Sequence, residues 1–236
     1  MCRTCEGGTL SRRTVIAGSL ALPLAAAPLV KAAAQTPAAG RPSSPEEALQ
    51  RLMEGNARYV ANQPINTDHS VGRAERAAGQ QPFAAVVSCS DSRVSPELIF
   101  DQGPGDIFVV RVAGNFINED GLASLEFGAA VLGVQTILVL GHSSCGAVVA
   151  TIDSIEDREL PPGHLPSLVN ALRPAVYDVM EENPADLLVA ATRRNAKLNA
   201  AKAVETGPIL SELSGAGKLA SAAGVYDIAT GKVELI

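Results

Sequence analysis

Three short apolar runs stand out along the chain, at residues 83–88, 107–112 and 136–140. None of them alternates polar with apolar positions, which is typical of strands that are buried on both faces of a parallel sheet. The run at 136–140, TILVL, is the strongest strand candidate in the chain. We therefore expect these runs to form the centre of a parallel sheet.

Helical patterns fill the segments around these runs. The clearest is residues 45–60, where Ser44 suits an N-cap, Pro45 suits the first helical position, and two acids follow in the first turn. Further helices are expected at residues 121–132, 146–155, 166–181 and 184–205, the last two each opened by a proline.

The C-terminal residues 224–236 have the pattern of a hairpin with a turn around 229–232. Strands that alternate with helices predict an α/β fold. We expect a mostly parallel central sheet flanked by helices, with an N-terminal helix and a C-terminal hairpin or edge strand.

The first 34 residues have the composition of a signal peptide. Arg12 and Arg13 precede an uncharged Ala/Leu-rich run at 15–30, and small residues at 32–34 suit a cleavage site. Paired arginines before a mildly apolar run resemble a twin-arginine signal. A general secretory signal and an uncleaved anchor remain alternatives. Residues 35–44 are expected to be a flexible linker, and residues 45–236 a single domain.

Export by the twin-arginine route predicts a periplasmic or secreted protein that crosses the membrane folded, without a stable membrane anchor after cleavage. Removing residues 1–34 takes away four basic residues and one acidic residue, so the formal net charge changes from −6 to −9. An acidic surface argues against nucleic acid or anionic lipid as partners.

Two segments carry candidate metal ligands. Cys89 directly follows the run at 83–88, and His142 and Cys145 follow the run at 136–140. Ligands of open parallel sheets bind at the carboxyl ends of the strands, where all three residues are expected. Two cysteines and one histidine suit tetrahedral zinc with an open fourth position, which is typical of a catalytic site. The alternative is a disulfide between the two cysteines.

These residues lie in motifs that resemble those of the β-class carbonic anhydrases. The segment CSDSRV is followed, 53 residues after its cysteine, by the histidine of GHSSCG. Further similarity extends from about residue 46 to the C-terminus, at residues 103–108, 111–115, 124–127 and 224–236. The resemblance implies one zinc ion per subunit and reversible hydration of carbon dioxide to bicarbonate and a proton.

The resemblance also implies roles for five residues. Cys89, His142 and Cys145 would hold the zinc. Arg93 would pair with Asp91, which would accept a hydrogen bond from the zinc-bound hydroxide and orient it. In a closed state, Asp91 would instead become the fourth zinc ligand. A plain surface ion pair is the alternative for Asp91 and Arg93.

Three further residues match substrate-pocket positions of the family, Gln80, Phe108 and Phe127, and Gly146 would let the backbone approach the substrate. The glutamine amide would face bicarbonate, and the two phenylalanines would line an apolar slot. A solvated loop residue is the alternative for Gln80, and ordinary core packing is the alternative for Phe108 and Phe127.

The resemblance implies at least a homodimer, or a higher homo-oligomer, with the pocket at the subunit boundary. Residues 45–60 and 116–130 are the candidate interface segments. Two other functions remain open: hydrolysis of carbonyl sulfide or carbon disulfide on the same fold, and binding of bicarbonate by a zinc-bearing protein without turnover. Intact Asp91 and Arg93 favour an enzyme over a mere binder.

Overall fold

The structure is a computed structural model that describes residues 40–70 and 72–236. The predicted signal peptide, residues 1–34, lies outside the described residues, and so does the first half of the predicted linker. In its second half, Pro42 is buried, and the Arg41 side chain donates hydrogen bonds to the carbonyl oxygens of Pro82 and Leu132.

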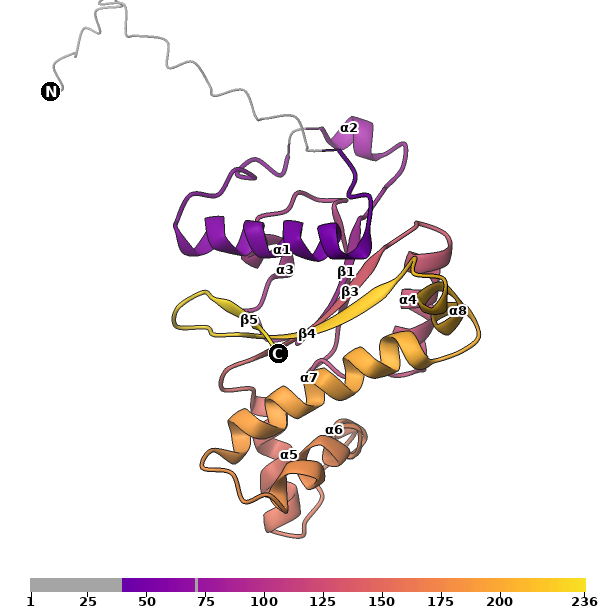
Figure 1. The fold of residues 1–236 in the computed structure, drawn as a ribbon. Coiled ribbons are helices and arrows are strands. Elements are labelled where there is room, and N and C mark those ends of the chain that lie inside the picture. Colours follow the sequence, from indigo (N-terminus) through magenta and orange to yellow (C-terminus); the bar gives the residue numbers. More distant parts are fainter. Residues whose placement is uncertain (1–39, 71) are drawn as a thin grey trace, which may run out of the picture. The chain divides into compact units, whose positions relative to one another are not determined.

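Figure 1 shows the order of the elements along the chain. The strands are β1 (Ala84–Ser88), β2 (Ile107–Arg111), β3 (Thr136–His142), β4 (Ala220–Tyr226) and β5 (Val233–Leu235). The helices are α1 (Pro45–Val60), α2 (Arg73–Arg76), α3 (Pro96–Ile99), α4 (Glu119–Ala130), α5 (Gly146–Glu156), α6 (Leu165–Met180), α7 (Leu187–Glu205) and α8 (Ile209–Gly215).

The five strands form one sheet in the order β2-β1-β3-β4-β5. The first four strands run parallel, and β5 pairs antiparallel with β4. Every residue of β1 and β3 is buried, because these two strands lie at the centre of the sheet and are covered on both faces. The predicted α/β fold with a mostly parallel sheet and a C-terminal hairpin is therefore confirmed.

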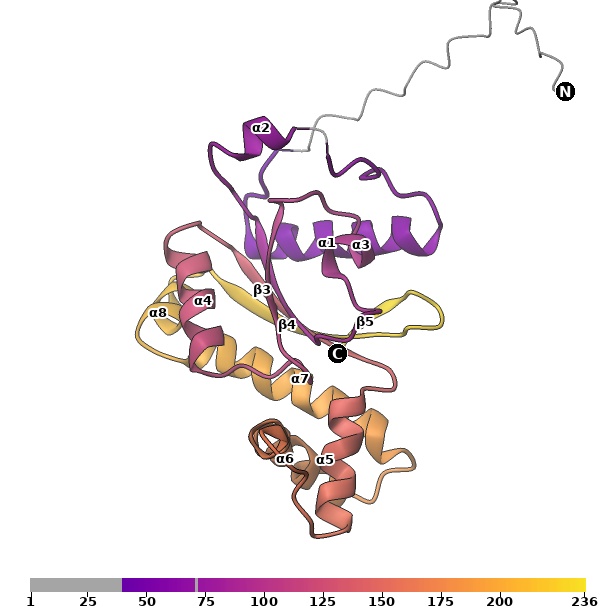
Figure 2. The ribbon, with the colours of Figure 1, turned by 180° about the vertical axis from the view of Figure 1, so that it is seen from behind.

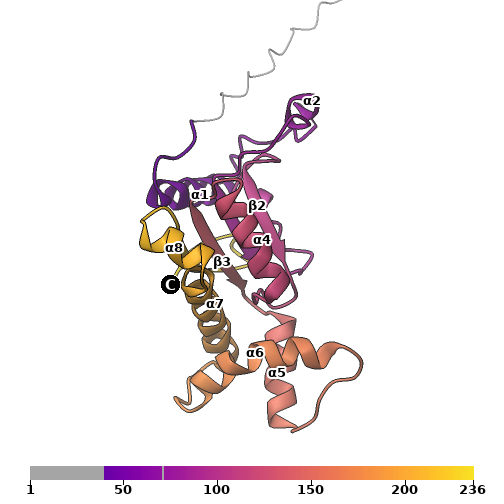
Figure 3. The same cartoon turned by 90° about the vertical axis from the view of Figure 1, so that its right-hand side faces the viewer.

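Helices cover both faces of the sheet (Figures 1 and 2). Ala84 and Val86 of β1 pack in a cluster with Ala48 and Leu52 of α1, whereas their neighbour Ala85 packs in a second cluster with residues of α4, α7 and α8. The alternation follows from the strand period of two residues. Helices α5 and α6 pack against the first turns of α7, away from α1 (Figure 3).

Local sequence signals place α1 as predicted. The Ser44 hydroxyl accepts a hydrogen bond from the Glu47 N–H at 3.2 Å, and Pro45 occupies the first turn. Both features satisfy or remove backbone donors that a helix start would otherwise leave without acceptors. The helix ends at Val60, the predicted position.

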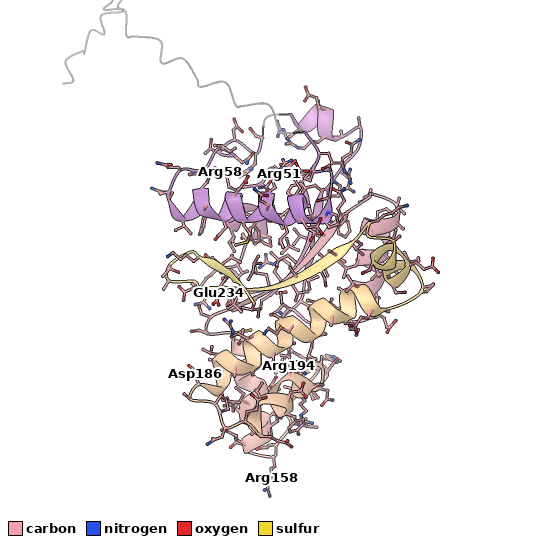
Figure 4. All side chains as sticks on the ribbon, in the orientation of Figure 1. Arg51, Arg58, Arg158, Asp186, Arg194 and Glu234 are labelled. Carbon is pink, nitrogen blue, oxygen red and sulfur yellow. The ribbon has the colours of Figure 1, made fainter. Side chains whose placement is uncertain are left out.

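Other boundaries differ from the prediction. Helix α7 begins at Leu187 instead of residue 184, because the Asp186 carboxylate caps it by accepting from the Val189 N–H at 2.9 Å (Figure 4). The hairpin prediction missed the first half of β4, which is rich in alanine and pairs with β3 along its whole length. The short helices α2, α3 and α8 were not predicted, because they are too short to show a helical period.

Among the described helices, none is both long and apolar enough to cross a membrane.

Candidate metal centre

Three candidate ligands meet at one edge of the sheet. Cys89 directly follows β1, His142 ends β3, and Cys145 is the N-cap residue of α5. Strands β1 and β3 are parallel neighbours, so their carboxyl ends lie side by side. The ligand atoms of the three residues all lie within 4.8 Å of one another, and none of the three residues is more than 5% exposed. The structure thus brings together residues that are 53 positions apart.

Hydrogen bonding fixes the chemistry of the His142 ring. Its Nδ1 lies 2.9 Å from the Ser143 carbonyl oxygen, which can only accept, so Nδ1 must carry the proton. In the neutral ring, Nε2 then presents a lone pair. This atom is buried and has no hydrogen-bond partner among the described residues. A buried nitrogen lone pair next to two sulfurs fits a metal ligand.

The two cysteines are free thiols in the structure and are not joined by a disulfide. A hydrogen bond from the Cys145 thiol outweighs the effect of burial and lowers the pKa of Cys89. The same hydrogen bond and burial raise the pKa of Cys145. Without a metal, the pair therefore shares one proton, which metal binding would displace. A thiolate, a second sulfur and an imidazole form a donor set that suits zinc.

Asp91 is held by Arg93 beside this group. The Arg93 backbone N–H and Nε both donate to Asp91 Oδ1 at 2.9 Å, and Nη2 donates to Oδ2 at 2.7 Å. These bonds lower the pKa of Asp91, so its carboxyl is ionised at neutral pH. Among the described residues, the group whose ligand atoms lie together contains Cys89, His142 and Cys145, without Asp91.

Arg111, at the end of β2, is a site residue whose role the sequence did not reveal. Its Nε donates to the Cys89 carbonyl oxygen at 2.9 Å, and its Nη2 donates to the Asp91 carbonyl oxygen at 2.7 Å. The register of the sheet sets this geometry, because Arg111 pairs with Ser88, the last residue of β1. Arg111 therefore fixes the backbone of the loop that bears Cys89 and Asp91.

The second ligand loop is tied to β4 and the turn that follows it. The Ser143 N–H donates to the Tyr226 carbonyl oxygen at 2.9 Å, and the Ser143 hydroxyl accepts from the Ile228 N–H at 3.0 Å. Gly146 lies beside Cys145 as the exposed first residue of α5, and a Cβ there would meet no atom within 4 Å. The surface next to Cys145 is therefore open at Gly146.

The other predicted pocket residues lie elsewhere in the same chain. Gln80 is exposed before the start of β1, at the opposite end of that strand from Cys89, and lines a cavity of about 550 Å³ with residues such as Arg51 and Asp106. At about 3.3 Å per residue, β1 alone separates the two ends by roughly 16 Å. The structure does not bring Gln80 to the metal ligands within one chain.

The two phenylalanines are also separate from the ligands. Phe108 lies within β2 opposite Ala85 and packs in the core cluster that includes residues of α4. Phe127, on α4, is 48% exposed. Their proposed contact with substrate stays a prediction.

Fold and site together define a class of protein: an α/β protein with a Cys₂His group that could hold a metal ion at the carboxyl edge of a parallel sheet. The family model described as carbonic anhydrase matches residues 84–233, which include all three candidate ligands and the Asp91–Arg93 pair. The chain belongs to the carbonic anhydrase family, and its fold and its structural relatives place it in the β class.

Individual relatives agree with this assignment. Carbonic anhydrase 2 of Mycobacterium tuberculosis is 48% identical over 135 residues, which are 57% of this chain and 65% of that protein. A carbonic anhydrase of Pseudomonas aeruginosa is 35% identical over 68% of this chain and 76% of its own length. Among solved structures, the Coccomyxa β-carbonic anhydrase in complex with acetazolamide has a TM-score of 0.64 at 26% identity, over 80% of this chain and 86% of that one.

Proposed function

We propose that the protein binds one zinc ion per subunit through Cys89, His142 and Cys145 and catalyses the reversible hydration of carbon dioxide to bicarbonate and a proton. The observation that carries this proposal is the buried group of two thiols and one imidazole, whose ligand atoms all lie within 4.8 Å of one another. Bound zinc would supply a Lewis acid that makes a water molecule acidic enough to attack carbon dioxide near neutral pH.

Asp91 orients the attacking water by accepting one of its hydrogen bonds. A carboxylate oxygen can accept about two hydrogen bonds. Oδ1 already receives two from Arg93, whereas Oδ2 receives one, so Oδ2 keeps an acceptor position. The lowered pKa of Asp91 keeps this position free of a proton. Arg93 thus holds the carboxylate in one orientation and keeps it from acting as a metal ligand.

Stopped-flow measurement of carbon dioxide hydration tests the activity. The purified protein should hydrate carbon dioxide, lose that activity when a chelator removes the metal, and regain it on adding zinc. Cys89→Ala should be inactive. Turnover of carbonyl sulfide without hydration of carbon dioxide would favour the hydrolase alternative, and zinc binding without any turnover would favour a bicarbonate-binding protein.

We further propose that the protein forms a homodimer or a higher homo-oligomer. Gln80 lies far from Cys89 of its own chain, so it can act at a metal site only if a second copy supplies it. Strand β2 is an edge strand of the sheet. Next to it, Phe127 of α4 and Val131, which follows the last residue of α4, are 48% and 65% exposed. Sedimentation should show at least a dimer, and a fully active monomer would refute the proposal.

We also propose that residues 1–34 are a twin-arginine signal peptide and that the folded protein is released into the periplasm or secreted. The paired Arg12 and Arg13 before an uncharged run support this proposal. Replacing both arginines by lysine should block export in a host with the twin-arginine route. Unchanged export of that variant would instead indicate the general secretory route.

A further inference from the structure

Helix α7 carries two buried asparagines, Asn195 and Asn199, one turn apart. They are 2% and 8% exposed. Asparagine is a weak helix former, and a buried amide costs free energy unless it is hydrogen-bonded. Such a pair is therefore expected to have specific partners, and its partners show what it does.

Both amides bind the loop between β2 and α4. Asn195 Nδ2 donates to the Gly114 carbonyl oxygen at 2.8 Å. Asn199 Oδ1 accepts from the Ile117 N–H at 2.8 Å, and Asn199 Nδ2 donates to Asn195 Oδ1 at 2.9 Å. The second asparagine therefore orients the first one and binds the same loop.

Lys202 extends this arrangement along the helix. Its Nζ donates to the Ile117 carbonyl oxygen at 2.8 Å. We call Asn195, Asn199 and Lys202 the α7 polar row. Its members are spaced by four and three residues, so they lie on one face of the helix. The row binds the loop at Gly114 and at both backbone groups of Ile117.

Gly114 connects the row to the metal centre. Its N–H donates to Cys89 Sγ at 3.3 Å, while its carbonyl oxygen accepts from Asn195. The residue has φ +86°, and a Cβ there would lie 2.8 Å from Leu172 Cδ1 and 3.2 Å from Ala147 Cβ. Gly114 is thus fixed by the sulfur on one side, by the amide on the other, and by close packing.

We propose that the α7 polar row positions Gly114 so that its N–H holds the Cys89 sulfur in the geometry of a metal ligand. The inference rests on the zinc site proposed above. Groups that bind the ligands of a metal commonly change its affinity by about 10–100-fold when they are removed. Asn195, Asn199 and Lys202 are therefore positioning residues, which act on the metal through the loop.

The test is zinc affinity of the full chain, measured by competition with a chromophoric chelator. Asn195→Leu removes the donor to Gly114, and we expect zinc to bind about 10–100-fold more weakly. Lys202→Met disturbs the far end of the row and should weaken binding less. In the cobalt-substituted protein, the thiolate-to-cobalt absorption should change in Asn195→Leu, because a displaced sulfur alters that band.

Asn56 of α1 provides a matched control. It is 4% exposed, and its amide makes three hydrogen bonds where that of Asn195 makes two. The partners are the Ile99 and Gly231 carbonyl oxygens and the Val233 N–H, none of which belongs to a ligand loop. Because each substitution removes the hydrogen bonds of a buried amide, Asn56→Leu and Asn195→Leu should both lower thermal stability, but Asn56→Leu should leave zinc affinity and the cobalt spectrum unchanged.

Wild-type zinc affinity and an unchanged cobalt spectrum in a folded Asn195→Leu variant would overturn this inference but not the proposed zinc site. An equal loss of affinity in Asn56→Leu would also overturn it, because the effect would then follow from lowered stability. If Asn195→Leu does not fold, the test is made with Lys202→Met. Wild-type zinc affinity in that variant would then overturn the inference. A wild-type chain that binds no zinc would overturn the metal site itself, and this inference with it.

Discussion

Arg93 supplies three hydrogen bonds to the Asp91 carboxylate, and its guanidinium binds the two carboxylate oxygens in a bidentate manner. Lysine keeps the charge but lacks the planar fork that binds both oxygens of a carboxylate. The orientation of Asp91 therefore depends on the shape of the arginine side chain as well as its charge.

Replacing Arg93 by lysine should lower kcat/KM for carbon dioxide hydration by about 10–100-fold, because Asp91 is no longer held in one orientation. Zinc content should stay at one per chain. The control is Arg194→Lys, which alters an exposed arginine–aspartate pair between α7 and α6, with a 2.7 Å contact to Asp178. Full activity of Arg93→Lys would contradict the role given to the pair.

Gly114 has a left-handed backbone conformation, with φ +86°, and its N–H donates to Cys89 Sγ. Gly114→Ala should lower the free energy of unfolding by about 1–2 kcal/mol for the left-handed conformation, and by about 1–3 kcal/mol more for crowding Leu172. Gly163→Ala is the control, because Gly163 also has a positive φ, of +69°, but a Cβ there meets nothing within 4 Å. Chemical denaturation measures the free energy of unfolding of both variants. An equal loss in the two would show that contact with Leu172 adds nothing to the cost of Gly114→Ala.

Helices and strands could be predicted from the sequence where the residues that fix their ends lie within or next to the element itself. Helix α1 was predicted to the residue because its N-cap and first-turn proline lie within its own sequence. The proline at 184 was misleading, since Asp186 supplies the cap of α7 two residues later. Strand β4 was partly missed because alanines carry little strand preference, and its pairing with β3 supplies the rest.

At the metal centre too, some residues could be predicted from the sequence and others could not. Cys89, His142 and Cys145 could be found from the sequence because their residue types carry the chemistry. Arg111 and Asn195 could not, because an arginine and a buried helical asparagine have many ordinary roles. Their contacts span 20 or more positions in the chain and exist only in the folded protein.

Segment 65–66 is fixed to the end of α3 by the buried carboxylate of Asp101. Burial raises the pKa of Asp101, but hydrogen bonds from Arg58 and from the N–H groups of Asn66 and Ile65 outweigh it, so the pKa is lowered overall. Because the unfolded state then binds the proton more tightly, stability should rise with pH through this titration.

The free energy of unfolding of the wild type should therefore exceed that of Asp101→Asn at neutral pH. The difference should be fully present above about pH 4, the ordinary range of an aspartate in an unfolded chain, and should shrink as pH falls further through the lowered pKa. Urea denaturation at a series of pH values measures it. A difference that stays constant down to the lowest pH would contradict the assignment.

For the whole molecule, metal binding and folding should be coupled, because the three ligands come from two loops that converge only in the folded chain. A ligand that binds only the folded state at 100 times its dissociation constant adds about 2.7 kcal/mol of stability. For a chain of this size, chelation should then lower Tm by about 5–10 °C. Calorimetry with and without chelator measures the shift, and no shift would show that the metal contributes nothing to folding.

The central claim is that two sulfurs and one imidazole nitrogen hold a single zinc ion. X-ray absorption of the zinc-loaded protein tests it directly, together with the zinc content per chain. The account predicts one zinc per chain, with two sulfur ligands at about 2.3 Å and the remaining nitrogen or oxygen ligands at about 2.0–2.1 Å. A zinc shell without sulfur would contradict it, and so would a purified protein in which Cys89 and Cys145 are oxidised and no zinc binds.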